Sequence, residues 1–257
     1  MFPIRDDNPQ FLTPYATWTI VGLNILAWVL VQGLGAGPAM ARSICMLGLV
    51  PGELFQLAPA NVAFPLGPDL YCMVTDQPAW LTVITHMFMH GSWMHIIGNM
   101  WFLWIFGNNV EDSMGSVRFI VFYLLCGLAA AGLQIATDPA SIVPMVGASG
   151  AIGGVMGAYI LLYPRVTVHM LIFLGFIVTT IAIPAFWMLG YWFLMQLLGG
   201  FSSIGASGGG VAFWAHVGGF VAGVVLIFLF RKPEFLKRHP YYGWNRRSGN
   251  AYRRIGH

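Results

Sequence analysis

Charged residues are scarce in this sequence. Only 8% of its 257 residues are Asp, Glu, Lys or Arg, whereas a soluble domain carries about 25%. Hydrophobic residues make up 58% of the chain, and the mean hydropathy is +0.73. The shortage of charge excludes an ordinary soluble domain. We therefore expect a polytopic membrane protein that forms one integral domain.

The chain is also poor in cysteine, and its three cysteines show no metal-type spacing. Cys126 lies in an apolar run. Cys45 and Cys72 fall in one loop and could pair, although two cysteines alone do not establish a disulfide. We expect no cleavable signal peptide, because the first segment carries Asp6 and Asp7, lacks a basic n-region and has no compelling cleavage site.

Six apolar stretches suggest an all-α integral membrane fold, since about 20 apolar residues span a bilayer. The predicted spans are residues 17–35, 93–107, 118–136, 149–163, 166–191 and 211–230. These spans form the predicted domain, residues 17–230. Residues 1–16 form an N-terminal segment, and residues 231–257 form a basic tail that we expect to be disordered.

The loop at residues 36–92 is rich in Leu, Trp, Met, Pro and Gly. A loop this apolar predicts short amphipathic helices in the membrane interface, with a small folded external cap as the alternative. The Gly/Ser-rich stretch at residues 199–210 predicts a flexible loop.

Basic residues set the orientation, because cytoplasmic loops are enriched in Lys and Arg. Eight of the twelve basic residues follow Phe230. With both termini in the cytoplasm, Arg42 alone lies outside; the reverse orientation puts eleven basic residues outside. We expect both termini inside a cell membrane, with the bacterial inner membrane favoured. The tail adjoins the lipid bilayer, and no nucleic-acid partner is expected because no nucleic-acid module accompanies it.

Four polar side chains then fall at one depth in the outer layer of the membrane, where polar groups are costly. They are His95 and Asn99 on the second span, Ser149 on the fourth and His216 on the sixth. Small residues recur every four positions beside Ser149 and beside His216, and such stripes let two helices approach closely. If the stripes face each other, Ser149 lies within reach of His216, as a nucleophile and its general base require.

Ser149 also stands at the N-terminus of a short helix, where free backbone N–H groups would stabilise an oxyanion. His95 and Asn99, spaced i and i+4, could add side-chain donors to that site. No aspartate lies at this depth, so a Ser–His dyad is the most that the sequence supports.

Each residue also has a structural interpretation. Ser149 could be a helix cap, His95 and Asn99 could join helices by hydrogen bonds, and His216 could be a satisfied buried histidine. Ser207 repeats the Gly-Ala-Ser-Gly pattern in a loop only nine residues before His216, so we prefer Ser149.

Two further histidines, His86 and His90, are spaced i and i+4 and could bind zinc on a helix. No His-Glu-x-x-His motif or third ligand accompanies them, so we interpret them as histidines that line the outer loop. No metal or cofactor is expected.

Taken together, the motifs resemble the rhomboid family of intramembrane serine proteases. They are His86-x3-His90-x4-His95-x3-Asn99, Gly147-x-Ser149-Gly150, and Ala215-His216-x2-Gly219-x3-Gly223. The resemblance covers about residues 17–230.

The resemblance implies Ser149 as nucleophile, His216 as general base, and His95, Asn99 and the Ser149 N–H as the oxyanion-binding group. It implies cleavage of membrane proteins in or near their transmembrane helices, a membrane-embedded first loop, and a fifth span that moves to admit substrate. A Glu-x-Trp-Arg element of many members is missing here, where Gln77-Pro78-Ala79-Trp80-Leu81 stands, so the anchoring of the first loop is open.

The alternatives are a catalytically silent rhomboid-like binder of membrane proteins and a transporter or channel. Inactive relatives lose the serine or histidine, and both are present here. A transporter would need a polar path across the membrane, whereas these polar residues stop at the outer layer.

Overall fold

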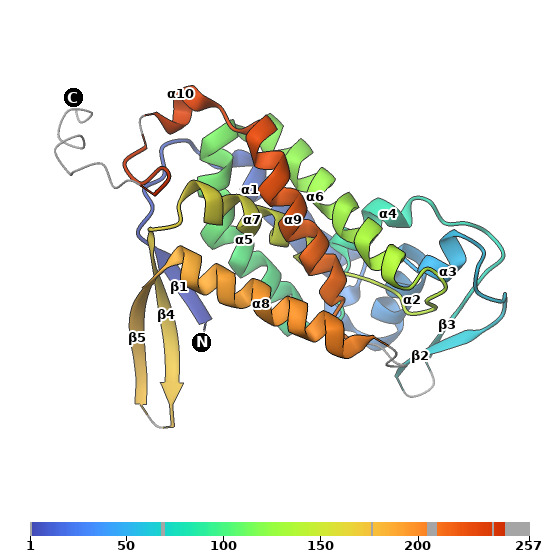
Figure 1. Cartoon of the computed structure of the whole chain (residues 1–257). Coiled ribbons are helices and arrows are strands. Elements are labelled where there is room, and N and C mark those ends of the chain that lie inside the picture. Colours follow the sequence, from blue (N-terminus) through green and yellow to red (C-terminus); the bar gives the residue numbers. More distant parts are fainter. Residues whose placement is uncertain (1, 68–69, 176, 205–209, 238, 245–257) are drawn as a thin grey trace.

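Six helices of 14 or more residues form the body of the computed structural model, which describes residues 2–67, 70–175, 177–204, 210–237 and 239–244 (Figure 1). They are α1 (Tyr15–Leu30), α5 (Trp93–Met114), α6 (Ser116–Thr137), α7 (Ser149–Leu162), α8 (Ala185–Ser203) and α9 (Phe213–Phe230). In the described part of the chain, α6 and α9 are long and apolar enough to cross a membrane, while α1 and α7 are shorter apolar helices.

Helix α7 is the centre of the bundle, because it packs against α5, α6, α8 and α9 and is buried along most of its length. Glycines bring α9 close to it. A Cβ at Gly219 would collide with the carbonyl oxygen of Gly150, and one at Gly223 would collide with that of Gly154. The prediction that the two small-residue stripes face each other is therefore confirmed.

The last turn of α5 holds the start of α1. The Glu111 carboxylate, fully buried, accepts hydrogen bonds from the backbone N–H groups of Ala16 and Thr17 at 3.0 and 2.8 Å. Asp112 accepts from the N–H groups of Phe11 and Leu12 at 2.6 and 2.8 Å. Glu111 thus satisfies N–H groups that a helix start leaves without intrahelical partners, and Asp112 holds the segment that leads into α1.

The first loop is a folded unit that mixes short helices with a β-hairpin. Its elements are η1 (Gly33–Gly35), α2 (Gly37–Leu47), α3 (Pro51–Leu54), β2 (Ala63–Gly67), β3 (Leu70–Met73), α4 (Thr82–Thr85) and η2 (His86–Phe88). Strands β2 and β3 pair antiparallel, and a disulfide between Cys45 and Cys72 ties α2 to β3. The pairing that the sequence left open is thus present.

Hydrogen bonds fix this loop to the bundle without a Glu-x-Trp-Arg element. The buried Gln32 amide, just after α1, donates to the carbonyl of His90 and accepts from its N–H, both at 2.8 Å. Leu49 exchanges two backbone hydrogen bonds with Met145 in the loop before α7. The loop is therefore tied both to α1 and to the segment that leads to Ser149.

The prediction of a fifth helix over residues 166–191 is wrong in its boundaries. Strands β4 (Thr167–Leu174) and β5 (Ile177–Pro184) form an antiparallel hairpin, and α8 begins only at Ala185. The hairpin sequence is dense in β-branched residues, which favour strands, and Gly175 takes a φ of +62° at the turn. Mean hydropathy alone does not distinguish such a hairpin from a helix.

The all-α prediction fails for a second reason, which is the N-terminal strand β1 (Phe2–Asp6). It pairs antiparallel with β4, so that the sheet has the order β1-β4-β5. The Trp101 indole on α5 donates to the carbonyl of Pro3 at 2.6 Å, and the ring of Phe2 lies 5.7 Å from that of Trp101. Over its described residues, the N-terminal segment predicted at residues 1–16 is therefore packed against the bundle.

The prediction of a disordered tail is wrong over its described part, residues 231–237 and 239–244. Helix α10 (Pro233–Leu236) follows α9, and Leu236 and His239 are buried. The His239 ring lies 4.5 Å from that of Tyr163. Apolar and aromatic side chains in this otherwise basic segment supply the contacts. The rest of the predicted disordered tail, residues 238 and 245–257, lies outside the described residues.

Candidate active site

Ser149 is the first residue of α7, and the turn before it depends on Gly147. Gly147 has a φ of +124°, and a Cβ there would lie 2.7 Å from Nε2 of His95. Its N–H donates to the carbonyl of His86 at 2.9 Å. A side chain at position 147 would therefore push the α7 start away from α5.

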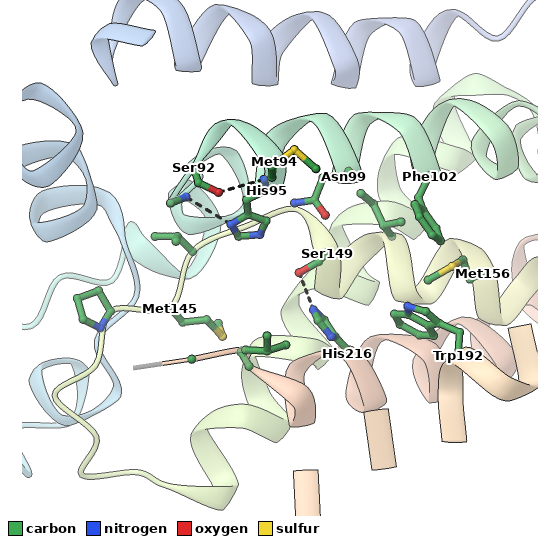
Figure 2. Close-up of a pocket in the computed structure, with 18 residues that line it drawn as sticks. Ser92, Met94, His95, Asn99, Phe102, Met145, Ser149, Met156, Trp192 and His216 are labelled. Atoms are coloured by element: carbon green, nitrogen blue, oxygen red, sulfur yellow. Dashed lines mark hydrogen bonds between the residues drawn. The ribbon is translucent and has the colours of Figure 1, made fainter. Parts of the chain in front are cut away.

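The side chains of Ser149 and His216 meet across the α7–α9 contact. The distance from Ser149 Oγ to His216 Nε2 is 2.8 Å (Figure 2). The start of α9 is held in turn by α6, because Gln134 accepts from the N–H of Ala215 at 3.1 Å. The glycine contacts between α7 and α9 thus bring a hydroxyl and an imidazole into hydrogen-bond reach.

The second ring nitrogen of His216 contacts α8. Nδ1 of His216 lies 2.8 Å from Oε1 of Gln196, which is 8% exposed. The ring of Trp192 lies 5.7 Å from the imidazole ring. Gln196 is not among the site residues that the sequence predicts, because the predicted fifth span ends at residue 191. An amide in an apolar helix was the signal that could have identified it.

His95 and Asn99 lie on the opposite side of Ser149 from His216, and both point toward the space above the serine (Figure 2). The N–H of His95 donates to Oγ of Ser92, which caps α5, and Nδ1 of His95 accepts from the N–H of Gly91 at 3.3 Å. Asn99 is 8% exposed, and its Nδ2 has no hydrogen-bond partner among the described residues. A buried amide donor is therefore free toward the space beside Ser149.

A cavity of about 560 Å³ opens between these side chains. Its lining combines the four polar residues with apolar walls. The lining residues are Gly91, Ser92, Met94, His95, Gly98, Asn99, Phe102, Pro144, Met145, Val146, Ser149, Ile152, Met156, Trp192, Gly210, Val211, Ala212 and His216. All four predicted site residues therefore face one space, and the cavity is large enough to hold side chains of a peptide.

The remaining histidines of the motif are buried behind this cavity. Nδ1 of His86 lies 2.8 Å from the carbonyl oxygen of Thr82. The ring of His90 lies 5.1 Å from that of His95. Burial lowers the pKa of His86 to about 4 and that of His90 to about 3, so both rings are neutral at pH 7. Across the described ranges, no three His, Cys, Asp or Glu side chains gather as metal ligands. Ser207, the alternative serine, lies outside the described residues.

The family of this chain follows from its match to a protein-family model. The family model for the rhomboid domain matches residues 77–233, which include all four candidate site residues. The chain belongs to the rhomboid family. It is therefore a member of a family of helical membrane proteins that includes serine proteases.

Similar proteins occur in bacteria and in plant organelles. Rhomboid protease GluP of Bacillus subtilis is 34% identical over 210 residues, which cover 82% of this chain and 34% of GluP. Rhomboid-like protein 11, chloroplastic, of Arabidopsis thaliana is 32% identical over 162 residues, covering 60% of this chain and 54% of that protein. RHOMBOID-like protein 6, mitochondrial, of the same plant is 27% identical over 260 residues, 93% of this chain and 75% of that protein. For the first two, the chain spans about half of the relative or less.

Proposed function

We propose that this rhomboid is an intramembrane serine endopeptidase that cleaves transmembrane proteins near the outer membrane face. The observation that carries the proposal is the 2.8 Å contact between Ser149 Oγ and His216 Nε2. A serine hydroxyl is a weak nucleophile until a base within hydrogen-bond reach takes its proton. The similarity to GluP, which is named a protease, supports the same reaction class.

The proposed reaction is acyl transfer in two steps. Ser149 Oγ attacks the peptide carbonyl carbon while His216 Nε2 takes the hydroxyl proton. His216 returns that proton to the leaving amine as the C–N bond breaks. Water, deprotonated by His216, then adds to the acyl-enzyme, and its proton returns to Ser149 as the ester bond breaks.

The negative oxygen of each tetrahedral intermediate needs donors on the side of Ser149 opposite the base. Asn99 supplies a buried amide without a partner among the described residues. His95 and the N–H of Ser149, at the positive end of α7, complete the proposed group. Losing one such donor costs about 10²–10³ in kcat, so Asn99→Ala should reduce turnover by that factor without changing the fold.

The proposed topology has six spans, α1, α5, α6, α7, α8 and α9, with both termini in the cytoplasm. The first loop, which holds the Cys45–Cys72 disulfide, then lies on the outer side, where disulfides persist. A bacterial inner membrane fits this arrangement. The substrates are membrane proteins whose transmembrane helix reaches the cavity from the lipid.

Purified protein in detergent and a fluorogenic transmembrane substrate test the proposal. Ser149→Ala and His216→Ala should each abolish cleavage, while Ser207→Ala should leave it unchanged. A fluorophosphonate probe should label the wild type at Ser149 and fail to label Ser149→Ala. Full cleavage by Ser149→Ala, or its loss only in Ser207→Ala, contradicts the assignment. No labelling of the wild type would favour the silent membrane-protein binder.

A further inference from the structure

Gln196 is a polar residue on the buried stripe of an otherwise apolar helix. It lies one turn after Trp192 on α8, and its amide is 8% exposed. An amide buried among apolar side chains is costly unless its donor and acceptor both have partners. Both do: Nε2 donates to the carbonyl of Trp192 at 3.2 Å, and Oε1 lies 2.8 Å from Nδ1 of His216.

The contact with Trp192 sets the orientation of the Gln196 amide, and that orientation sets which nitrogen of His216 carries the proton. The carbonyl oxygen of Trp192 can only accept, so it must face the NH₂ group of Gln196. The amide oxygen then faces His216, and because it also only accepts, Nδ1 of His216 must carry a proton. In a neutral imidazole, a protonated Nδ1 leaves Nε2 with a lone pair. That lone pair faces Ser149 Oγ.

We propose that Gln196 is a positioning residue that holds His216 in the tautomer able to take the proton of Ser149. The inference rests on the proposed protease function and adds a third member to its dyad. Gln196 takes the place that a buried carboxylate occupies in serine proteases with a full triad, where the carboxylate sets the histidine tautomer.

A neutral amide suits this position for a physical reason. A carboxylate in the same apolar surroundings would bring a charge that is costly to desolvate. The amide supplies the acceptor without that cost, and its own NH₂ group is satisfied within α8. The Trp192 ring, packed beside the imidazole, limits rotation of His216 about its side-chain bonds.

Both groups that orient His216 belong to α8, whereas His216 belongs to α9 and Ser149 to α7. The base is therefore oriented only while α8 is packed against α9. The stacked rings of Phe193 and Phe220, 4.4 Å apart, help to hold that contact. A displacement of α8 would remove the tautomer control and the ring contact together.

Steady-state kinetics with two substitutions test the role. Gln196→Met keeps the side-chain length but removes the acceptor, and should lower kcat by up to about 10²–10⁴-fold, the contribution of a positioned general base, with little change in KM. Gln196→Glu keeps an acceptor oxygen, so it should retain more activity than Gln196→Met. Its pH–activity profile should have the acid limb shifted to higher pH, because a carboxylate stabilises the imidazolium. Leu194→Met, on the exposed side of α8, is the matched control.

Thermal unfolding of each variant separates positioning from folding. Unchanged unfolding temperatures with a selective loss of kcat support the proposal. Wild-type kcat in Gln196→Met, a rise in KM alone, or equal losses in both variants that follow their unfolding temperatures would overturn it.

A readout without substrate separates this inference from the proposed function. The ¹⁵N shifts of His216 should show a protonated Nδ1 and a bare Nε2 in the wild type, and a shift of the population toward the Nε2–H tautomer in Gln196→Met. His216→Ala identifies the signals. An inactive wild type with this tautomer pattern would defeat the protease proposal alone. An active wild type with its proton on Nε2 would defeat the Gln196 proposal alone.

Discussion

The candidate role of a single residue in this site depends on which of its hydrogen-bonding groups have a partner. Asn99 is a candidate oxyanion donor because its amide N–H group is buried and unpartnered among the described residues. His216 is a candidate base because one ring nitrogen faces Ser149 and the other faces Gln196. A polar group in apolar surroundings is costly unless it is paired, so an unpaired donor in the cavity indicates a place for a ligand oxygen.

Asp6, on strand β1 and away from the cavity, gives a prediction on how the stability of the protein depends on pH. Burial raises the pKa of its carboxyl from 3.8 to about 6, although the Tyr159 hydroxyl donates to it. Between about pH 4 and pH 6 the folded state therefore binds more protons than the unfolded state, and this group makes stability fall as pH rises. Asp6→Asn, which cannot ionise, should unfold at a higher temperature than the wild type at pH 7.

That difference should disappear as the pH is lowered to about 4, where Asp6 is protonated in the folded state. Thermal unfolding of both proteins in detergent across pH 4–7 measures it. Asp138→Asn, at an exposed site, is the control. A stability gain that is the same at every pH would contradict the explanation.

Elements are held together here by two kinds of helix contact, and the first is steric. The α7–α9 seam has no space for a Cβ at Gly219 or Gly223. Gly219→Ala should destabilise the protein by about 1–3 kcal/mol, as overpacking of a buried contact does, and should lower activity because it separates Ser149 from His216. Unfolding temperature and cleavage rate measure the effect.

Gly190→Ala is the matched control for that substitution. Gly190 also lies inside a helix, α8, but a Cβ there would meet nothing within 4 Å. Alanine is favoured over glycine in a helix, so this variant should be as stable as the wild type or more so. Equal losses in the two variants would show that the seam is not the cause.

The second kind of contact is polar and joins α1 to α5. Glu111 receives hydrogen bonds from Ala16, Thr17 and Ser116 on both of its oxygens. Glu111→Gln replaces one acceptor oxygen by an NH₂ group that faces donors. The variant should therefore lose about 1–3 kcal/mol of stability, measured by unfolding. Glu234→Gln, at an exposed position on α10, should be neutral. A neutral Glu111→Gln would exclude this role.

On the scale of the whole molecule, the disulfide and α10 lie at opposite ends of the bundle. The Cys45–Cys72 bond belongs to the first loop, and α10 follows the far end of α9 (Figure 1). Closing a loop of 27 residues stabilises a protein by about 3–4 kcal/mol in the chain-entropy model. The proposed orientation puts this bond in the oxidising compartment, where it persists.

Cysteine labelling in intact cells tests that orientation. After mild reduction, a membrane-impermeant maleimide should label the partly exposed Cys45 without permeabilisation. Glu234→Cys, on α10, should react only after the membrane is opened, and the buried Cys126 serves as an unreactive internal control. Labelling of Glu234→Cys in intact cells would reverse the proposed topology.

Much of the bundle could be predicted from local properties of the sequence. Hydropathy located the helices at residues 93–107, 118–136, 149–163 and 211–230 to within a few residues, apart from an α5 that continues to Met114. It failed at residues 166–191, because an apolar hairpin and an apolar helix have the same hydropathy. It also missed the packed tail, where a few aromatic and apolar side chains outweigh a basic composition.

The sequence by itself determined the membrane character, the two small-residue stripes and the four polar residues of the candidate site, because composition and spacing along a helix are local properties. Only the tertiary structure decided which groups surround His216. Gln196 reaches it from 20 positions earlier in the chain, on a helix whose start the sequence misplaced. A hydrogen-bond partner depends on how α8 packs against α9, and no local pattern contains that information.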